Sequence, residues 1–160
     1  MNKLSRFWNR NDTYFRAGAG MFIYTSDNEF LLFERKLNPG SFQFPQGGRD
    51  TGETFEETLW RELEEEVALG KDDFETVSTF PHLLSYEYLA KDNVLDWLGQ
   101  THQWFYLKLK DNTKIDLSLA TEPEFTSYKL VSEEEVLSGI YKDKRLVYTQ
   151  LFEHFNKEIK

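Results

Sequence analysis

The sequence predicts a single domain of mixed α/β class, in which helices lie on the faces of a mixed β-sheet. The chain has 160 residues, 39% hydrophobic and 16% aromatic, which is enough to bury a sizeable core. Strand-like runs are interspersed with helical segments, so helices are expected to pack against a sheet. No regular βαβ repeat is present, which favours a mixed sheet over a purely parallel one.

The first part of the chain is predicted to form a hairpin and a loop. Residues 17–24 (AGAGMFIY) have the composition of a buried strand. Residues 29–35 (EFLLFER) follow after the turn-like sequence SDN, so the two strands form a hairpin. Residues 37–41 (LNPGS) form a loop, and a short extended piece at 42–44 ends at Pro45.

A helix is expected over about 54–67, because Thr54 and Glu57 have the spacing of a capping box. Its buried stripe consists of apolar residues at every fourth position, namely Phe55, Leu59, Leu63 and Val67. A turn around 70–73 (GKDD) ends this part of the chain.

The second half is predicted to supply the remaining strands. Residues 74–89 are strand-prone, and residues 92–100 (DNVLDWLGQ) form a long loop. Strands follow at 104–110 (WFYLKLK) and at 124–131 (EFTSYKLV).

Helices are expected to close the chain. Ser132 and Glu135 form a second capping box, so a short helix begins there. A C-terminal helix is expected from about residue 144, with apolar residues at helical spacing, namely Leu151, Phe152, Phe155 and Ile159.

Composition excludes several classes of protein. The net charge is −9, so DNA is not an expected partner through bulk electrostatics. The chain has no cysteine, which excludes a disulfide framework and thiolate chemistry. No run approaches about 18 apolar residues, and the N-terminal MNKLSRFWNRND has no apolar run behind its charges. We therefore expect a cytoplasmic protein with no membrane partner.

Three glutamates of the 54–67 helix fall on its inward-leaning side. At about 100° per residue, with Glu62 at zero, Glu66 lies near 40°, inside the apolar stripe. Glu65 lies near 300°, beside Glu62. Glu57 and Glu64 fall near 200° on the outer face and are expected to be ordinary surface residues.

The inward glutamates require compensation. Ionised carboxylates so close together repel one another, and an unpaired buried charge costs several kcal/mol. Arg61 can pair with one acid but cannot neutralise three. An ion-pair network without metal remains an alternative to a bound divalent cation with oxygen ligands, for which Mg²⁺ is the expected ion and Mn²⁺ a substitute. Gly47, Gly48 and Gly52 lie in the loop before the helix and allow the backbone to turn tightly and approach a ligand closely.

The segment from Gly47 to Leu69 resembles the Nudix box. That signature is Gly, five residues, Glu, seven residues, Arg-Glu, an apolar residue, any residue, Glu-Glu, any residue, Gly and an apolar residue. The residues that match at this spacing are Gly47, Glu53, Arg61, Glu62, Leu63, Glu65, Glu66 and Leu69. Ala68 stands where the family usually has glycine, which bears on the turn after the helix and not on the chemistry.

The resemblance extends over about residues 14–155. The stretches FQFPQGG (42–48), GQTHQWFYLKL (99–109) and EPEF (122–125) look like the branch that includes bacterial RNA pyrophosphohydrolase and dinucleoside polyphosphate hydrolases. The resemblance implies a Nudix fold, an α/β/α sandwich around a mixed β-sheet. It also implies one Nudix domain over 1–160, of which we expect 1–12 to be flexible or loosely docked.

The resemblance also implies roles for the acids. Matched to the family, the metal ligands are Glu62, Glu65 and Glu66, with Glu124 as an extra ligand. The general base is Glu66 or Glu124. Glu53 assists the metal or the water, and Arg61 orients one of the helix acids through an ion pair. The residues assigned to substrate binding are Arg16, Arg35, Lys36, Gly47 and Gly48.

Three functions remain open at this point. The resemblance implies a hydrolase of nucleoside polyphosphates, and a dinucleoside polyphosphate of the diadenosine tetraphosphate type is the favoured substrate because net charge −9 weakens RNA binding. The alternative is an RNA pyrophosphohydrolase acting on the 5′-triphosphate end, with a local basic patch available to it, namely Arg6, Arg10, Arg16, Arg35 and Lys36. A non-catalytic nucleotide-binding module is the third, and it is disfavoured because every acid of the box is present. His102 is expected to have a structural or surface role rather than to contact the substrate.

Overall fold

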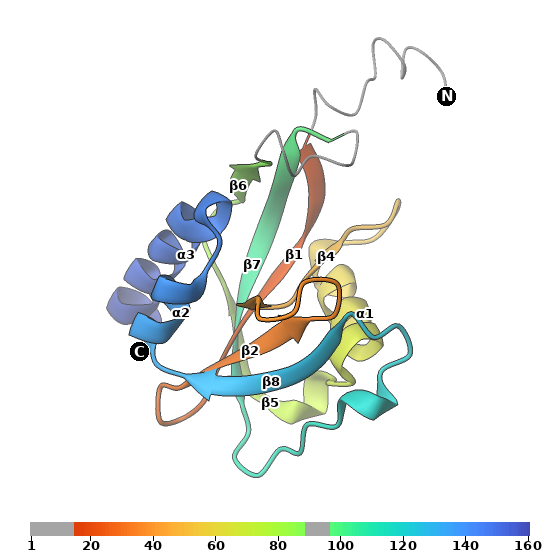
Figure 1. Ribbon diagram of the computed structural model, residues 1–160, viewed down its shortest axis with the longest axis vertical. Coiled ribbons are helices and arrows are strands. Elements are labelled where there is room, and N and C mark those ends of the chain that lie inside the picture. The colour runs from red at the N-terminus through yellow and green to blue at the C-terminus, as the bar shows by residue number, and fades with distance from the viewer. Residues whose placement is uncertain (1–14, 89–96) are drawn as a thin grey trace.

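The computed structural model describes residues 15–88 and 97–160 (Figure 1). The predicted N-terminal segment 1–12 lies outside the described residues, as does most of the expected loop at 92–100. No helix in the described part of the chain is long and apolar enough to cross a membrane.

A mixed β-sheet forms the middle of the molecule. Its strands in the described ranges are β1 (Phe15–Tyr24), β2 (Phe30–Arg35), β3 (Phe42–Gln43), β4 (Gln46–Gly48), β5 (Phe74–Thr79), β6 (Leu84–Glu87), β7 (Gly99–Leu109) and β8 (Phe125–Val131). The central order is β3-β2-β1-β7-β5, with β4 paired to β1, β6 to β7 and β8 to β2. β1 and β7 run parallel, from Phe15 opposite Gly99 to Tyr24 opposite Lys108, whereas the other pairs are antiparallel. The mixed sheet is therefore confirmed.

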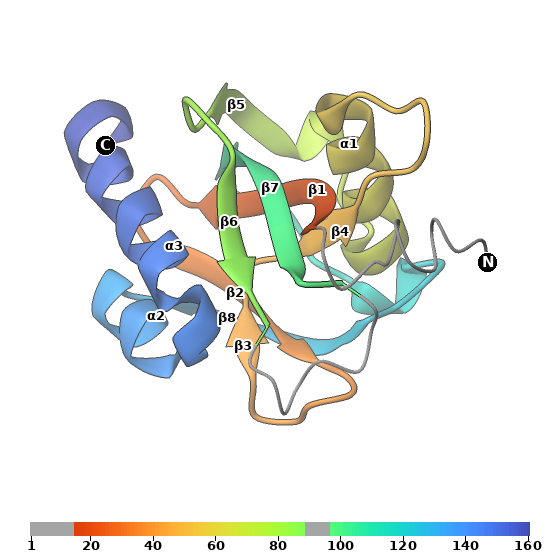
Figure 2. The same cartoon turned by 90° about the horizontal axis from the view of Figure 1, so that it is seen from above.

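Helices cover both faces of this sheet. The helices are α1 (Phe55–Val67), α2 (Glu133–Gly139) and α3 (Lys142–His154), and a π-helical segment (Phe155–Ile159) continues α3. Figures 1 and 2 show α1 on one side of the sheet and α2 with α3 on the other. The predicted α/β/α sandwich is confirmed.

The sheet divides the apolar core into two clusters. Successive side chains of a strand point to opposite faces. On β1, Phe22 and Tyr24 join the cluster on the α2/α3 side, whereas Met21 and Ile23 join the cluster on the α1 side. The predicted C-terminal apolar residues Leu151, Phe152 and Phe155 are buried in the first cluster, and Ile159 packs against it, as expected.

The structure departs from the sequence-based boundaries in three places. Gly47 and Gly48, which were expected to lie in the loop before the helix, instead pair with β1 as part of β4. The strand-prone run 74–89 is divided into β5 and β6, with Pro81 between them. β7 begins at Gly99, inside the expected loop, because its first residues pair with the start of β1.

Candidate active site

Helix α1 presents the acids and begins and ends as local chemistry dictates. Thr54 Oγ1 accepts a hydrogen bond from Glu57 N (3.1 Å), and a Glu57 carboxylate oxygen accepts from Thr54 N (2.7 Å), which completes the predicted capping box. Ala68 has φ 57° and donates its N–H to the Glu64 carbonyl, so this alanine adopts the left-handed conformation usual for glycine.

Arg61 lies at the centre of the acidic residues. Its Nε and Nη2 donate to the two Glu53 oxygens at 2.5 and 2.8 Å. Its Nη1 donates to Glu62 at 2.9 Å and to Glu65 at 3.1 Å. Nη2 also donates to the Gly48 carbonyl at 2.9 Å. The guanidinium therefore orients two helix acids, where the resemblance implied one.

Glu53 is fully engaged by protein donors. Besides Arg61, one of its oxygens accepts from Asp50 N (3.0 Å) and from Thr58 Oγ1 (2.8 Å). The hydrogen bonds from Arg61 are the largest cause that lowers the pKa of Glu53 from 4.5 to about 2. Glu53 is thus an ionised partner that holds the Arg61 side chain in place.

Glu66 is the most deeply buried acid of the site. It is 4% exposed, and its Oε2 has no hydrogen-bond partner among the described residues. Burial, together with the carboxylates of Glu124 and Glu62, raises the pKa of Glu66 from 4.5 to about 10. Burial also raises the pKa of Glu62, against the opposing effect of Arg61. The inward position predicted for Glu66 is confirmed, as are the exposed positions of Glu57 and Glu64.

These acids offer oxygen ligands for a hard cation. In residues 15–88 and 97–160 no three acidic or histidine side chains are grouped closely enough to hold a metal ion as they stand. Glu62 and Glu65 each direct an oxygen to Arg61 instead. The unpartnered buried oxygen of Glu66 nevertheless fits a divalent cation, which would remove the cost of burying its charge.

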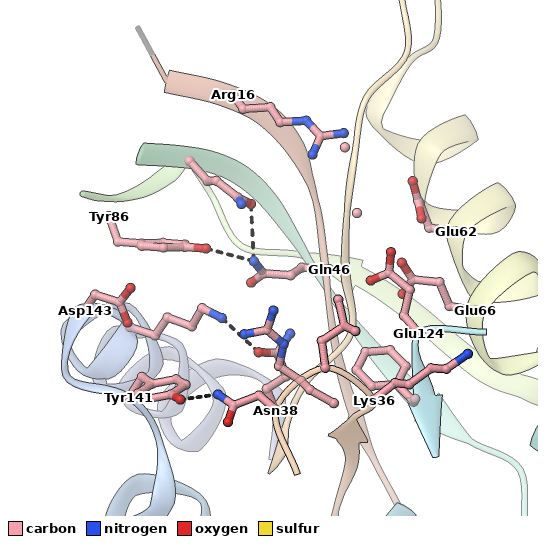
Figure 3. A pocket seen from close by; sticks show the side chains of 18 of the residues that line it. Arg16, Lys36, Asn38, Gln46, Glu62, Glu66, Tyr86, Glu124, Tyr141 and Asp143 are labelled. Atoms are coloured by element: carbon pink, nitrogen blue, oxygen red, sulfur yellow. Dashed lines mark hydrogen bonds between the residues drawn. The ribbon is translucent and has the colours of Figure 1, made fainter. Parts of the chain in front are cut away.

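A cavity of about 750 Å³ opens beside the acids. Figure 3 shows Glu62, Glu66 and Glu124 on one side of it and Tyr86, Tyr141 and Asp143 on the other. Eight of the eleven predicted site residues line the cavity, namely Arg16, Arg35, Lys36, Gly47, Gly48, Glu62, Glu66 and Glu124. The other three, Glu53, Arg61 and Glu65, do not line the cavity. Arg61 contacts both of these glutamates.

The two glycines of β4 leave room for site side chains. A Cβ atom on Gly47 would overlap the Glu62 carboxylate, and one on Gly48 would overlap the Arg16 guanidinium. The strand therefore brings Glu62 and Arg16 to the same edge of the cavity. These glycines act through the space they leave for neighbouring side chains.

Sequence reasoning missed the residues that α3, β3 and β6 contribute. Lys144 is 5% exposed and donates to Gln43 Oε1 at 2.8 Å. Burial, followed by the neighbouring Arg35, lowers the pKa of Lys144 from 10.5 to about 8. Gln46 donates to Tyr86 Oη at 2.9 Å. No local pattern marks these residues. Lys144 reaches Gln43 only where α3 packs against the sheet, and Gln46 reaches Tyr86 only because β4 pairs with β1 and β6 with β7.

His102 is a buried residue, so of the structural and surface roles expected of it, the surface role is wrong. It is 1% exposed and packs between Tyr86 and Trp104 on the α2/α3 side of the sheet. Burial lowers its pKa from 6.5 to about 3, so the imidazole is neutral.

The geometry can be compared with known proteins. The NUDIX domain family model matches residues 14–151. The chain belongs to the Nudix family. Nudix hydrolases generally need divalent metal ions, which agrees with the acids that α1 carries. The predicted family is confirmed.

Curated Nudix relatives share much of this sequence. RNA pyrophosphohydrolase of Nitratiruptor sp. is 41% identical over 137 residues, 84% of this chain and 86% of the relative. RNA pyrophosphohydrolase of Pseudoalteromonas translucida is 35% identical over 146 residues, 88% of this chain and 84% of the relative. This chain is therefore a Nudix pyrophosphohydrolase acting on acid anhydrides, as predicted.

Solved Nudix structures share the fold. Dihydroneopterin triphosphate pyrophosphohydrolase of E. coli matches with a TM-score of 0.68 at 20% identity, over 86% of this chain and 96% of that one. Ap4A hydrolase of C. elegans matches with a TM-score of 0.65 at 20% identity, over 88% and 98% of the two chains. At this identity the likeness concerns the fold alone.

Proposed function

We propose that this Nudix hydrolase removes pyrophosphate from the 5′-triphosphate end of RNA. The observation that carries the proposal is the agreement among relatives 34–41% identical, aligned over 84–93% of this chain, which are named RNA pyrophosphohydrolase. They support the RNA substrate better than the dinucleoside polyphosphate that the net charge favoured.

The charge of the cavity removes the objection that the acidic net charge raised. Its lining has four cationic residues, Arg16, Arg35, Lys36 and Lys144. It has four acidic residues, Glu62, Glu66, Glu124 and Asp143. The formal charge of the lining is therefore zero, whereas that of the whole chain is −9. An anionic RNA end meets a far less repulsive surface there than the total charge suggests.

The acids beside the cavity would hold the divalent cation. Its ligands would be drawn from Glu62, Glu65, Glu66 and Glu124, and the ion would be Mg²⁺, or Mn²⁺ as a substitute. When bound, such an ion neutralises charge on phosphate oxygens and lowers the pKa of a bound water. Arg61 fixes the orientation of Glu62 and Glu65, and Glu53 in turn fixes Arg61.

The remaining residues would bind the substrate and accept a proton. Arg16 on β1, Arg35 at the end of β2 and Lys36 in the loop after β2 line the cavity and would bind phosphate oxygens. Water adds across the α–β anhydride bond, which leaves a 5′-monophosphate on the RNA and releases pyrophosphate. Glu66 or Glu124 would accept the proton of that water.

A substrate panel tests the proposal. We expect 5′-triphosphorylated RNA to give the highest kcat/KM with Mg²⁺ among diadenosine polyphosphates, ADP-ribose and nucleoside triphosphates, and to yield pyrophosphate. A higher kcat/KM for diadenosine tetraphosphate would replace this proposal with the dinucleoside polyphosphate hydrolase. Absence of turnover on every substrate would favour a nucleotide-binding module.

Glu66→Gln tests the role of the buried acid. We expect turnover to fall by about 100-fold or more, because the neutral amide cannot accept a proton and brings no negative charge to a bound cation. The fold should be retained, as judged by circular dichroism and metal-free melting. Glu64→Gln, on the exposed face of α1, is the matched control. Full activity of Glu66→Gln would show that Glu66 is neither an essential metal ligand nor the general base.

A further inference from the structure

Glu34, near the end of β2, contacts two segments that carry site residues. One of its oxygens accepts a hydrogen bond from Gly40 N at 2.8 Å, in the loop that follows β2. The other accepts from Ser127 Oγ at 2.8 Å and from Thr126 Oγ1 at 3.4 Å, at the start of β8. A single carboxylate therefore joins the loop after β2 to the strand that follows Glu124.

The contact with β8 lies at an irregularity in strand pairing. Glu34 pairs with Ser127, but Arg35 pairs with Phe125, so Thr126 is an extra residue on β8. Such a bulge changes the face to which the following side chains point. Phe125 is consequently 5% exposed in the α1-side cluster, and the neighbouring Glu124 lines the cavity. The hydroxyl groups that Glu34 accepts from belong to the residues that form the bulge.

The contact with Gly40 secures the other segment. The loop that follows Arg35 brings Lys36, Leu37 and Asn38 to the cavity. Lys36 N donates to the Glu124 carbonyl at 2.8 Å, so the two segments are also joined directly at the cavity. Figure 3 shows Lys36 and Glu124 in the part of the cavity that also contains Glu66.

We propose that Glu34 is a positioning residue of the active site, which holds Lys36 and Glu124 in register by anchoring both the loop after β2 and the bulge of β8. The inference rests on the proposed function, which assigns Lys36 to phosphate binding and Glu124 to metal binding or proton transfer. Glu34 itself does not line the cavity and acts through these two residues.

The chemistry of the position favours a carboxylate. Three donors converge on Glu34, and an ionised carboxylate accepts from all of them without presenting a donor of its own. The hydrogen bonds from Gly40 and Ser127 lower its pKa, with a smaller contribution from Lys129 on β8. A glutamine would keep a single oxygen and would turn an N–H₂ group toward one set of donors.

Kinetics of Glu34 variants test the proposal. For Glu34→Ala we expect KM for 5′-triphosphorylated RNA to rise by about tenfold, because small misplacements of binding groups are costly. Glu34→Gln should give a smaller rise, since one acceptor remains. Glu29→Gln, which removes an exposed acid at the opposite end of β2, is the matched control and should leave KM unchanged. A KM for Glu34→Ala within about twofold of the wild type would overturn the proposal.

A double-mutant cycle separates positioning from general destabilisation. If Glu34 acts through Lys36, Glu34→Ala should raise KM less in a Lys36→Ala background than in the wild type. An equal rise in both backgrounds would overturn the proposal. If Glu34→Ala does not fold, Ser127→Ala is used instead, because it removes the hydroxyl group that donates to Glu34. The rise in KM that Ser127→Ala causes should also be smaller in the Lys36→Ala background than in the wild type. Equal rises in the two backgrounds would overturn the proposal.

Failure of the proposed function gives a different result. If diadenosine tetraphosphate is cleaved and RNA is not, the RNA assignment is wrong, and the same cycle is measured on diadenosine tetraphosphate. A non-additive effect there would retain Glu34 as a positioning residue, and an additive one would reject it.

Discussion

At Gly47 and Gly48, the absence of a side chain leaves room for other side chains of the site. Both glycines were expected to let the backbone approach a ligand. In the structure the space above them is filled by Glu62 and by Arg16 of the same chain. The atoms that a methyl group would displace are the ends of flexible side chains, so a substitution should disturb the site more than the fold.

We expect Gly48→Ala and Gly47→Ala to have separable effects. Gly48→Ala should displace Arg16 and raise KM for the substrate by about tenfold, while kcat changes less. Gly47→Ala should displace Glu62 and increase the Mg²⁺ concentration needed for half-maximal rate. Steady-state kinetics with Mg²⁺ titration measures both. If both variants lost activity only in proportion to a fall in melting temperature, the separate effects on Arg16 and Glu62 would be contradicted.

The hydrogen bonds of Glu53 predict a pH dependence of stability. Its pKa in the folded protein is about 2, below the ordinary 4.5, so the unfolded chain binds this proton first as the pH falls. The contribution of Glu53 to the free energy of unfolding is therefore complete above pH 4.5 and is lost as the pH falls toward 2.

Urea denaturation of metal-free protein measures that contribution. The difference in free energy of unfolding between the wild type and Glu53→Gln should be largest at neutral pH and should shrink in the acid range. Glu64→Gln, an exposed change on the same helix, serves as the control. A difference for Glu53→Gln that does not depend on pH would contradict the role assigned to the Arg61–Glu53 pair.

At the scale of the element, the end of α1 carries strain that can be removed. Ala68 has a φ of 57°, which costs an L-residue other than glycine about 1 kcal/mol. Ala68→Gly should therefore raise the free energy of unfolding by about that amount, without changing kcat. Ala120→Gly, at a φ of −66°, is the control and should give no gain. Destabilisation by Ala68→Gly would show that the methyl group of Ala68 contributes packing that outweighs the strain.

The elements that the sequence predicted are those with local signals. The Thr54 capping box and the apolar stripe of α1 depend on residues close together in the chain, so they are visible without a structure. β4 was missed because Gln46–Gly48 has no apolar alternation, and pairing with β1 alone makes it a strand. The start of β7 was missed for the same reason, because Gly99 and Gln100 are strand residues only through their pairing with β1 and β6.

The site was predictable to the extent that its residues belong to one motif. The box supplied the acids of α1, and their angles around the helix predicted that Glu66 would be buried. The sequence did not predict that Arg61 would contact Glu53, Glu62 and Glu65 together, because their side-chain directions depend on packing. Lys144 was missed because a lysine on a helix is usually exposed, and its burial depends on docking against Gln43.

At the scale of the whole molecule, charge is distributed unevenly, and this predicts how salt affects binding. RNA binding releases counterions in proportion to the phosphates that cationic residues neutralise. We expect the affinity of the Glu66→Gln variant for 5′-triphosphorylated RNA to fall as the salt concentration rises. When Lys36→Ala is added to this variant, the magnitude of the slope of log affinity against log salt should decrease by about one. Lys110→Ala, away from the cavity, is the control. If Lys36→Ala and Lys110→Ala gave equal slopes of log affinity against log salt, Lys36 would not be a phosphate-binding residue.

The parallel pairing of β1 with β7 has a consequence for biosynthesis. β1 is made early, yet its parallel partner is residues 99–109, and the cavity is also lined by Lys144 on α3. During translation, the edge of β1 that pairs with β7 therefore stays without its partner until residues 99–109 have been made, and it must not pair with another strand in that time. A chain truncated before Lys144 would contain the complete acidic helix α1 but would lack one of the four cationic residues that line the cavity.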